Sequence, residues 1–124
     1  MNIMTKRKLL FIVFTNDSCT RNHAFMHALN LTEKGHTARI LLEGEATRCV
    51  AEQEGFFGDL FKAARSKDIL LGACKTASGG CSTSDPARNV VALAEAQDIP
   101  LLDGMNGHAS IAEYVDDGFE IVVY

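Results

Sequence analysis

Short apolar runs alternate with segments of helical periodicity along the chain. Residues 9–15 are apolar almost without interruption, which is typical of a strand covered on both faces. Four further runs are predicted to be strands, at residues 37–42, 69–72, 101–102 and 119–124. Because helical patterns separate these runs, they indicate a parallel sheet with helices packed on its faces.

The segments between the strands carry the signals of helices. Phe25, Ala28 and Leu29 fall at helical spacing, and Gly35 follows them as a stop signal. Ser110 opens a capping-box pattern. The predicted helices cover residues 20–34, residues 45–65 with a break near 55–58, a segment that begins at Asp85-Pro86, and a segment from Ser110 that Gly118 closes.

Length and composition fit one domain. The chain has 124 residues, of which 47% are hydrophobic and 23% charged, and this is enough to bury a core. Together with the alternation of elements, this predicts a single domain over residues 1–124. We expect a three-layer α/β/α, Rossmann-like fold with a five-stranded parallel sheet.

The charges do not form a basic stripe. The formal net charge is -4, and the basic residues are scattered except for Lys6, Arg7 and Lys8, so no nucleic-acid partner is expected. The apolar run after these three residues is too short for a signal peptide, and no small-residue cleavage site follows it. No stretch reaches membrane-spanning length. We therefore expect a cytoplasmic protein without a membrane span.

The four cysteines are Cys19, Cys49, Cys74 and Cys81, and in a reducing cytosol they are expected to be thiols rather than a disulfide framework. Cys74 and Cys81 bound a stretch of small residues that leaves the carboxyl end of the third predicted strand. Ligands and chemistry collect at this edge of such sheets. This stretch, predicted to be a loop, is therefore the first candidate site.

Known phosphate and metal motifs do not fit the stretch. A Walker loop needs glycines where Ile69 and Cys74 stand. A phosphatase loop needs an arginine where Gly80 and Ala87 stand. Cysteine pairs that bind zinc are usually closer together in sequence than these two. We expect no cofactor and no metal.

Three interpretations of Cys74 stay open. In the first, Cys74 forms a transient disulfide with Cys81 across a loop that contains two glycines. Alternatively it is a reactive thiol, because Lys75 and the helix expected near Pro86 place positive charge beside it and favour the thiolate. The third interpretation is an inert, inward-facing strand residue, since a free cysteine behaves as a small hydrophobe.

The segment after the first strand is a second candidate site. Asn16, Asp17 and Cys19 are expected to form a ligand-binding loop, although Asp17 or Ser18 is more simply an N-cap of the next helix. His108, before the last helix, is a candidate base at the same edge of the sheet.

Several features resemble the DsrE/DsrF-like family. They are the order of elements, Gly35-His36 before the second strand, the cysteine stretch after the third, and the ending S-x-x-E-Y-x-x-x-G-F-x-I-x-V-Y over residues 110–124. The resemblance covers nearly the whole chain. It implies a Rossmann-like fold, assembly into trimers or hexamers and, in sulfur-relay members, a persulfide-bearing cysteine that maps best onto Cys74 and less well onto Cys81. The Gly-Gly-Cys segment departs from the relay pattern, in which an alanine-rich helix ends in arginine and glycine.

These observations predict a small cytosolic sulfur-carrier or sulfurtransferase-like protein. Cys74 is expected to accept sulfane sulfur as a persulfide, and Lys75 to stabilise its thiolate. Cys81, after the flexible pair Gly79-Gly80, is the expected resolving thiol. The expected partners are proteins that donate and accept sulfur.

A homo-oligomer, either a dimer, a trimer or a hexamer, is also expected. The resemblance implies it, and Phe56-Phe57 at a helix break is an apolar step of the kind that marks association surfaces. The alternative function is a non-enzymatic regulatory or small-ligand-binding module that uses the loops after the first and third strands.

Overall fold

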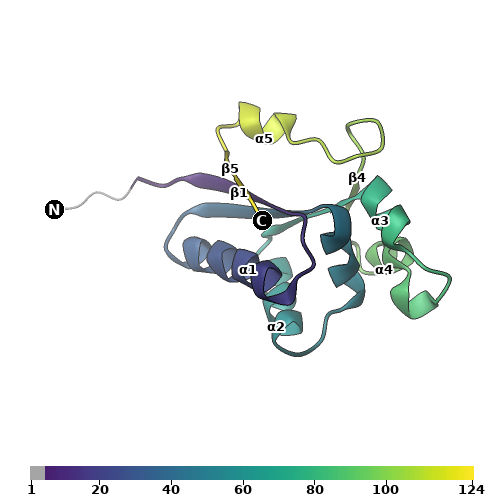
Figure 1. Ribbon diagram of the computed structural model, residues 1–124. Coiled ribbons are helices and arrows are strands. Elements are labelled where there is room, and N and C mark those ends of the chain that lie inside the picture. Colours follow the sequence, from purple (N-terminus) through teal and green to yellow (C-terminus); the bar gives the residue numbers. More distant parts are fainter. Residues whose placement is uncertain (1–4) are drawn as a thin grey trace.

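The computed structural model describes residues 5–124, and its centre is a five-stranded, all-parallel sheet in the order β4-β3-β2-β1-β5 (Figure 1). The strands are β1 (Lys8–Val13), β2 (Thr37–Leu42), β3 (Leu70–Cys74), β4 (Leu101–Leu102) and β5 (Glu120–Val123). β1 lies between β2 and β5, which explains why its residues are apolar on both faces. The predicted parallel sheet is confirmed.

Helices cover both faces of the sheet, as the three-layer prediction required. The helical segments are α1 (Ser18–Glu33), η1 (Gly44–Ala51), α2 (Gly55–Ser66), α3 (Lys75–Cys81), η2 (Pro86–Arg88), α4 (Val90–Ala96) and α5 (Ala112–Asp116). α1, α2, η1 and α4 bury the larger core, which includes Phe25, Phe57 and Phe61. The opposite face carries a smaller core beneath α5, with Leu10, Ile12 and Cys74 (Figure 1).

The cap of α1 follows the sequence. Asp17 is the N-cap, and its carboxylate accepts hydrogen bonds from the Thr20 backbone N–H and hydroxyl, both at 3.0 Å. These bonds lower the pKa of Asp17 below its ordinary value. The N-cap interpretation of Asp17 is therefore confirmed.

The stretch between Cys74 and Cys81 differs from the prediction, because it is the helix α3 and not a loop. The helix begins directly after β3, with Cys74 as its N-cap residue, and Ser78 on its inner face is fully buried. The prediction of a loop depended on Gly79 and Gly80, because glycine lowers helix propensity. Packing of α3 against η1 and α4 overrides that propensity.

Two helix starts also differ. The helix expected at Asp85-Pro86 is only the short 3₁₀ turn η2, and α4 starts after Asn89, whose side chain caps it. At the last helix, the Ser110 hydroxyl accepts a bond from the Ala112 N–H, two residues on, and the residue preceding α5 is Ile111. The expected capping box is therefore not formed.

A close approach of backbones shapes the edge of the sheet at Gly72. Its φ is 151°, and a Cβ at this position would lie 2.3 Å from the Pro100 carbonyl oxygen. The Ala73 N–H donates to the same carbonyl at 2.9 Å. Only glycine lets β3 pass this close to the residue before β4.

The helix break predicted near residues 55–58 lies earlier, at residues 52–54, so Phe56 and Phe57 stand in the first turn of α2. Phe57 packs edge-on against Phe25 in the core, while Phe56 is 59% exposed. One ring of the pair is thus available at the surface. The homo-oligomer stays a prediction.

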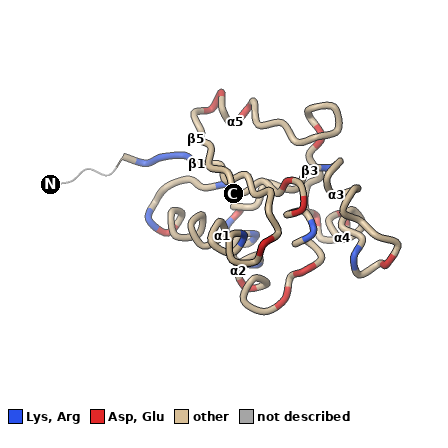
Figure 2. Tube along the Cα trace, in the orientation of Figure 1, with Lys and Arg blue, Asp and Glu red and all other residues tan. Residues whose placement is uncertain are grey.

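Charged residues are spread over the chain, with one basic run at residues 6–8 (Figure 2). Arg7 pairs with Glu120 at 2.7 Å and Lys8 with Asp117 at 3.2 Å, so part of this run is neutralised beside β5. No helix within residues 5–124 is long and apolar enough to cross a membrane.

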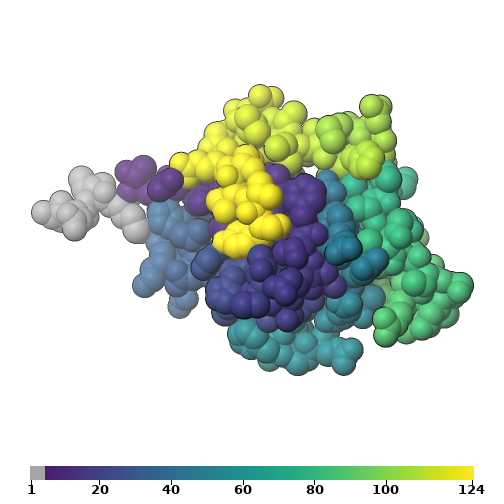
Figure 3. Space-filling model, viewed as in Figure 1, coloured from purple at the N-terminus to yellow at the C-terminus, as the bar shows by residue number. Residues whose placement is uncertain are grey.

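The C-terminal residues lie at the surface against α1 (Figure 3). There the His27 imidazole is hydrogen-bonded to the Tyr124 hydroxyl, and partial burial raises the pKa of Tyr124. This contact fastens the end of β5 to the outer helical layer.

Candidate functional site

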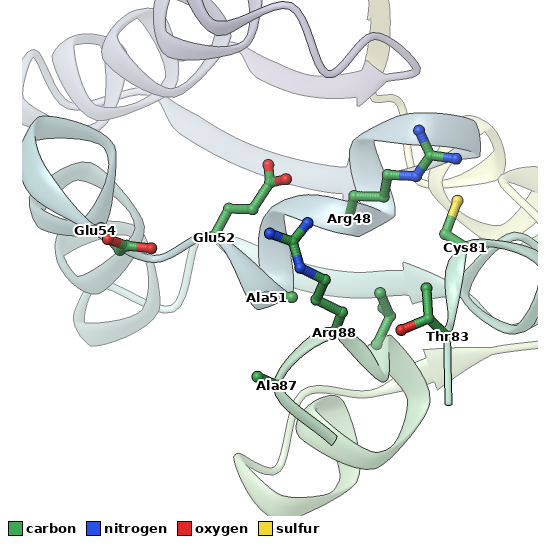
Figure 4. Close-up of a pocket in the computed structure, with 9 residues that line it drawn as sticks. Arg48, Ala51, Glu52, Glu54, Cys81, Thr83, Ala87 and Arg88 are labelled. Carbon is green, nitrogen blue, oxygen red and sulfur yellow. The ribbon is translucent and has the colours of Figure 1, made fainter. Parts of the chain in front are cut away.

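A pocket of about 270 Å³ lies beside the carboxyl end of α3 (Figure 4). Its walls come from η1 and the residues that follow it, from the end of α3 and the segment after it, from η2, and from the first residue of α4. The lining residues are Arg48, Ala51, Glu52, Glu54, Cys81, Thr83, Ala87, Arg88 and Val90. The pocket therefore combines a thiol, a hydroxyl, two guanidinium groups and two carboxylates.

Cys81 is the thiol of this pocket. Its side chain packs partly on the larger core, and its Sγ donates to the Gly44 carbonyl at 3.6 Å. Cys81 is only partly buried, and its sulfur extends toward the pocket's Arg48 side (Figure 4). A reagent that enters the pocket can therefore reach this sulfur.

The two arginines come from different elements. Arg48 stands on η1, with its Nη1 3.9 Å from the Glu45 carboxylate, and both side chains are largely exposed. Arg88 is the last residue of η2 and extends across the pocket toward Glu52 (Figure 4). Its guanidinium has no hydrogen bond or ion pair to another side chain in the described part of the chain.

The backbone around η2 holds Arg88 in place. The Asp85 carboxylate accepts a bond from the Ala87 N–H at 3.0 Å. The Thr83 N–H donates to the Arg88 carbonyl at 3.2 Å. These bonds fix the backbone from which the Arg88 side chain extends.

Glu52 is held by the segment after β1. Asn16 donates to its carboxylate at 2.9 Å, and the Arg21 guanidinium lies 3.5 Å from it. Arg21 is buried and stacks on the Phe57 ring at 3.7 Å from its centroid. Asn16, expected in a ligand-binding loop, therefore orients a side chain of the pocket's wall.

Cys74 lies in a different environment. It is fully buried in the smaller core, among Leu10, Ile12 and Leu41. Its Sγ is 3.7 Å from Nδ1 of His108, the expected base. Cys74 and His108 are thus neighbours, but the thiol is closed to solvent.

A strap of residues 103–108 covers the start of α3. The Gly107 carbonyl accepts bonds from the Thr76 N–H at 3.1 Å and from the Thr76 hydroxyl at 2.6 Å. Lys75, expected to stabilise a Cys74 thiolate, instead forms an ion pair with Asp103 at 3.6 Å. The strap is thus tied to the first turn of α3, directly after Cys74.

Cys19 stands on the exposed first turn of α1. Its Sγ is 3.8 Å from Nδ1 of His23, whose ring is also bonded to the Cys19 carbonyl. Cys19 does not line the Cys81 pocket, and Asp17 is engaged in capping α1.

α3 places Cys74 and Cys81 at opposite ends, about 10 Å apart at the helical rise of about 1.5 Å per residue. A disulfide needs Cα atoms within about 7 Å. A Cys74–Cys81 disulfide would therefore require α3 to unwind.

Sequence reasoning missed Arg48 and Arg88. Both residues come after the carboxyl end of a strand in the sequence. Arg48 follows β2 by several residues, and Arg88 follows β3 with α3 in between. The rule that ligands collect at this edge of the sheet could have included them. Their convergence depends on how η1 and η2 pack, which local patterns do not report. Within residues 5–124, no group of three or more His, Cys, Asp or Glu side chains is placed to hold a metal ion.

One relative comes from the archaeon Archaeoglobus fulgidus. It is 36% identical over 44 residues, which make up 36% of this chain and 72% of the archaeal protein. This chain and the archaeal protein belong to one family. The relative is described as an uncharacterized protein. No family profile and no solved structure matches the chain.

Proposed function

We propose that the protein is a sulfur carrier, or sulfurtransferase-like protein, in which Cys81 bears the transferred sulfur. The observation that carries the proposal is that Cys81 opens onto a pocket, whereas Cys74 is fully buried. A thiol that accepts and passes on sulfur must meet both donor and acceptor. Access therefore favours Cys81 over Cys74, the reverse of the roles expected from sequence.

The remaining cysteines fit other roles. Cys49 is fully buried, and burial raises the pKa of its thiol, so it packs as a small hydrophobe. Cys19 is exposed on a helix surface and does not line the pocket that could orient a donor. Cys74 is fully buried next to the exposed His108, whose Nδ1 lies 3.7 Å from its Sγ.

In the proposed step, the Cys81 thiolate attacks a sulfane sulfur atom. A new bond forms between Sγ and that sulfur, the sulfur's bond to the donor breaks, and the donor fragment leaves with the bonding electron pair. The product is a Cys81 persulfide. Donor and acceptor proteins, membership of the DsrE/DsrF-like family and assembly into a homo-oligomer belong to the same proposal.

The test is loading with an uncharged organic trisulfide. Attack of the Cys81 thiolate on its central sulfur breaks one S–S bond and expels an alkyl thiolate, so Cys81 takes up that sulfur together with the remaining alkylthio group. Mass spectrometry of peptides locates this mixed trisulfide adduct. We expect the added sulfur on Cys81, its loss in Cys81→Ser, and its retention in Cys74→Ser and Cys19→Ser. If Cys74→Ser alone abolishes loading, Cys74 is the sulfur-bearing thiol, as expected from the sequence. If the unchanged protein takes up no sulfur, the small-ligand-binding module is the better function.

A further inference from the structure

We propose that the Cys81 pocket selects a small sulfur-bearing oxyanion as its donor, with Arg48 and Arg88 binding the oxygen atoms. This inference rests on the proposed function, because it names the class of donor for the same thiol. Thiosulfate is the simplest compound of this class and serves as the probe.

The first support is that two arginines line the same pocket as the Cys81 thiol. Arg48 and Arg88 reach the pocket from opposite walls, η1 and η2 (Figure 4). Guanidinium groups present planar sets of N–H donors that suit the oxygens of an oxyanion. Thr83, on the same wall as Cys81, adds a hydroxyl that can donate to an anion.

The second support is that both guanidinium groups are available. Arg88 has no side-chain partner within the described residues. The contact of Arg48 with Glu45 is long, at 3.9 Å, and exposed, so it holds the guanidinium only weakly. An anion that binds both arginines would therefore disrupt only the weak Arg48–Glu45 contact and form two charge-assisted hydrogen bonds.

The third support is the placement of the carboxylates. Glu54 lies at the opposite side of the pocket from Cys81 (Figure 4). Glu52 accepts a hydrogen bond from Asn16, and the Arg21 guanidinium offsets its charge. The Cys81 side of the pocket therefore carries Arg48 and none of the lining carboxylates, while Arg88 extends from the η2 wall toward Glu52 (Figure 4). An anion that binds Arg48 there would lie near the thiol.

The reaction balances without any further reactant. The Cys81 thiolate attacks the outer sulfur of thiosulfate, the Sγ–S bond forms, and the S–S bond of thiosulfate breaks. Sulfite leaves with the bonding electron pair, and the Cys81 persulfide anion remains. The thiol proton goes to solvent before the attack. The two arginines would bind the oxygens that belong to sulfite both before and after transfer.

The experiment compares two donors in the full chain, thiosulfate and an uncharged organic trisulfide. Arg48→Gln and Arg88→Gln should each slow loading from thiosulfate about tenfold, the effect of losing one charge-assisted contact, and leave loading from the trisulfide unchanged. Arg65→Gln is the matched control, because Arg65 lies outside this pocket and bonds to the Gln97 carbonyl. That variant should load from both donors at the original rates.

An independent readout uses sulfate, which cannot transfer sulfur. Sulfate should slow alkylation of Cys81 by a neutral reagent in the unchanged protein and have less effect in Arg88→Gln. If the arginine variants slow loading from both donors equally, or from neither, the inference is overturned. If the protein loads from the trisulfide and not from thiosulfate, the inference fails while the proposed function stands. Failure to load from either donor removes the proposed function.

Discussion

Replacing Gly80 by alanine should stabilise the protein, whereas replacing Gly72 by alanine should destabilise it. The two positions lie on either side of Cys74 and receive the same extra methyl group. Gly80 is inside α3, and a Cβ there would meet no atom within 4 Å. At Gly72, a Cβ would lie 2.3 Å from the Pro100 carbonyl oxygen.

The magnitudes follow from these environments. In a helix, alanine is favoured over glycine by about 0.5–1 kcal/mol, so Gly80→Ala should raise the free energy of unfolding by that amount. At Gly72, crowding of the backbone costs about 1–3 kcal/mol and the positive φ about 1 kcal/mol more. The free energy of unfolding should therefore fall by about 2–4 kcal/mol in Gly72→Ala.

Urea unfolding followed by circular dichroism measures both changes. With a slope of about 2 kcal/mol per molar urea, the Gly72→Ala midpoint should fall by about 1–2 M and the Gly80→Ala midpoint should rise by a few tenths. A lower midpoint for Gly80→Ala would mean that residues 75–81 are not helical. A neutral Gly72→Ala would contradict the close approach of β3 to Pro100.

In the native protein, an alkylating reagent should modify Cys19 and Cys81 before Cys74, because only Cys74 of these three is fully buried. Peptide mass spectrometry gives the order of labelling, and early labelling of Cys74 would contradict its burial. Thr76→Val should speed the labelling of Cys74, since it removes the hydroxyl bond that holds the strap; an unchanged rate would show that the strap does not control access. Asp17 should contribute stability through its charge above its ordinary pKa of 3.8, and this contribution should be lost as the pH falls through its lowered folded-state pKa. The free energy of unfolding, measured across that acidic range, should depend less on pH in Asp17→Asn, which keeps a capping side chain. The same pH dependence in the variant and the unchanged protein would refute this.

The sequence predicted the sheet well, because a strand buried on both faces leaves a strong local record. The uninterrupted apolar run of β1 is such a record, and the cap formed by Asp17 is another. Both signals depend on neighbouring residues alone. Elements governed by local chemistry were therefore recovered with nearly their observed bounds.

The candidate site was harder to predict because it depends on tertiary packing. Gly79 and Gly80 suggested a flexible loop, yet contacts of α3 with η1 and α4 make this stretch helical. That helix separates the two cysteines and turns only Cys81 toward a pocket. Whether a cysteine is buried, and which arginines face it, are decided by elements that are distant in sequence.

The position of β1 between β2 and β5 has a consequence for synthesis on the ribosome. β2 follows β1 closely in the chain, but β5 begins only at Glu120. At about 5–20 residues per second, the stretch from the end of β2 to β5 takes about 4–16 s to translate. During this time the apolar edge of β1 has no partner and can pair with another nascent chain. A chaperone that shields this edge should therefore raise the yield of folded protein, most strongly where translation is slow.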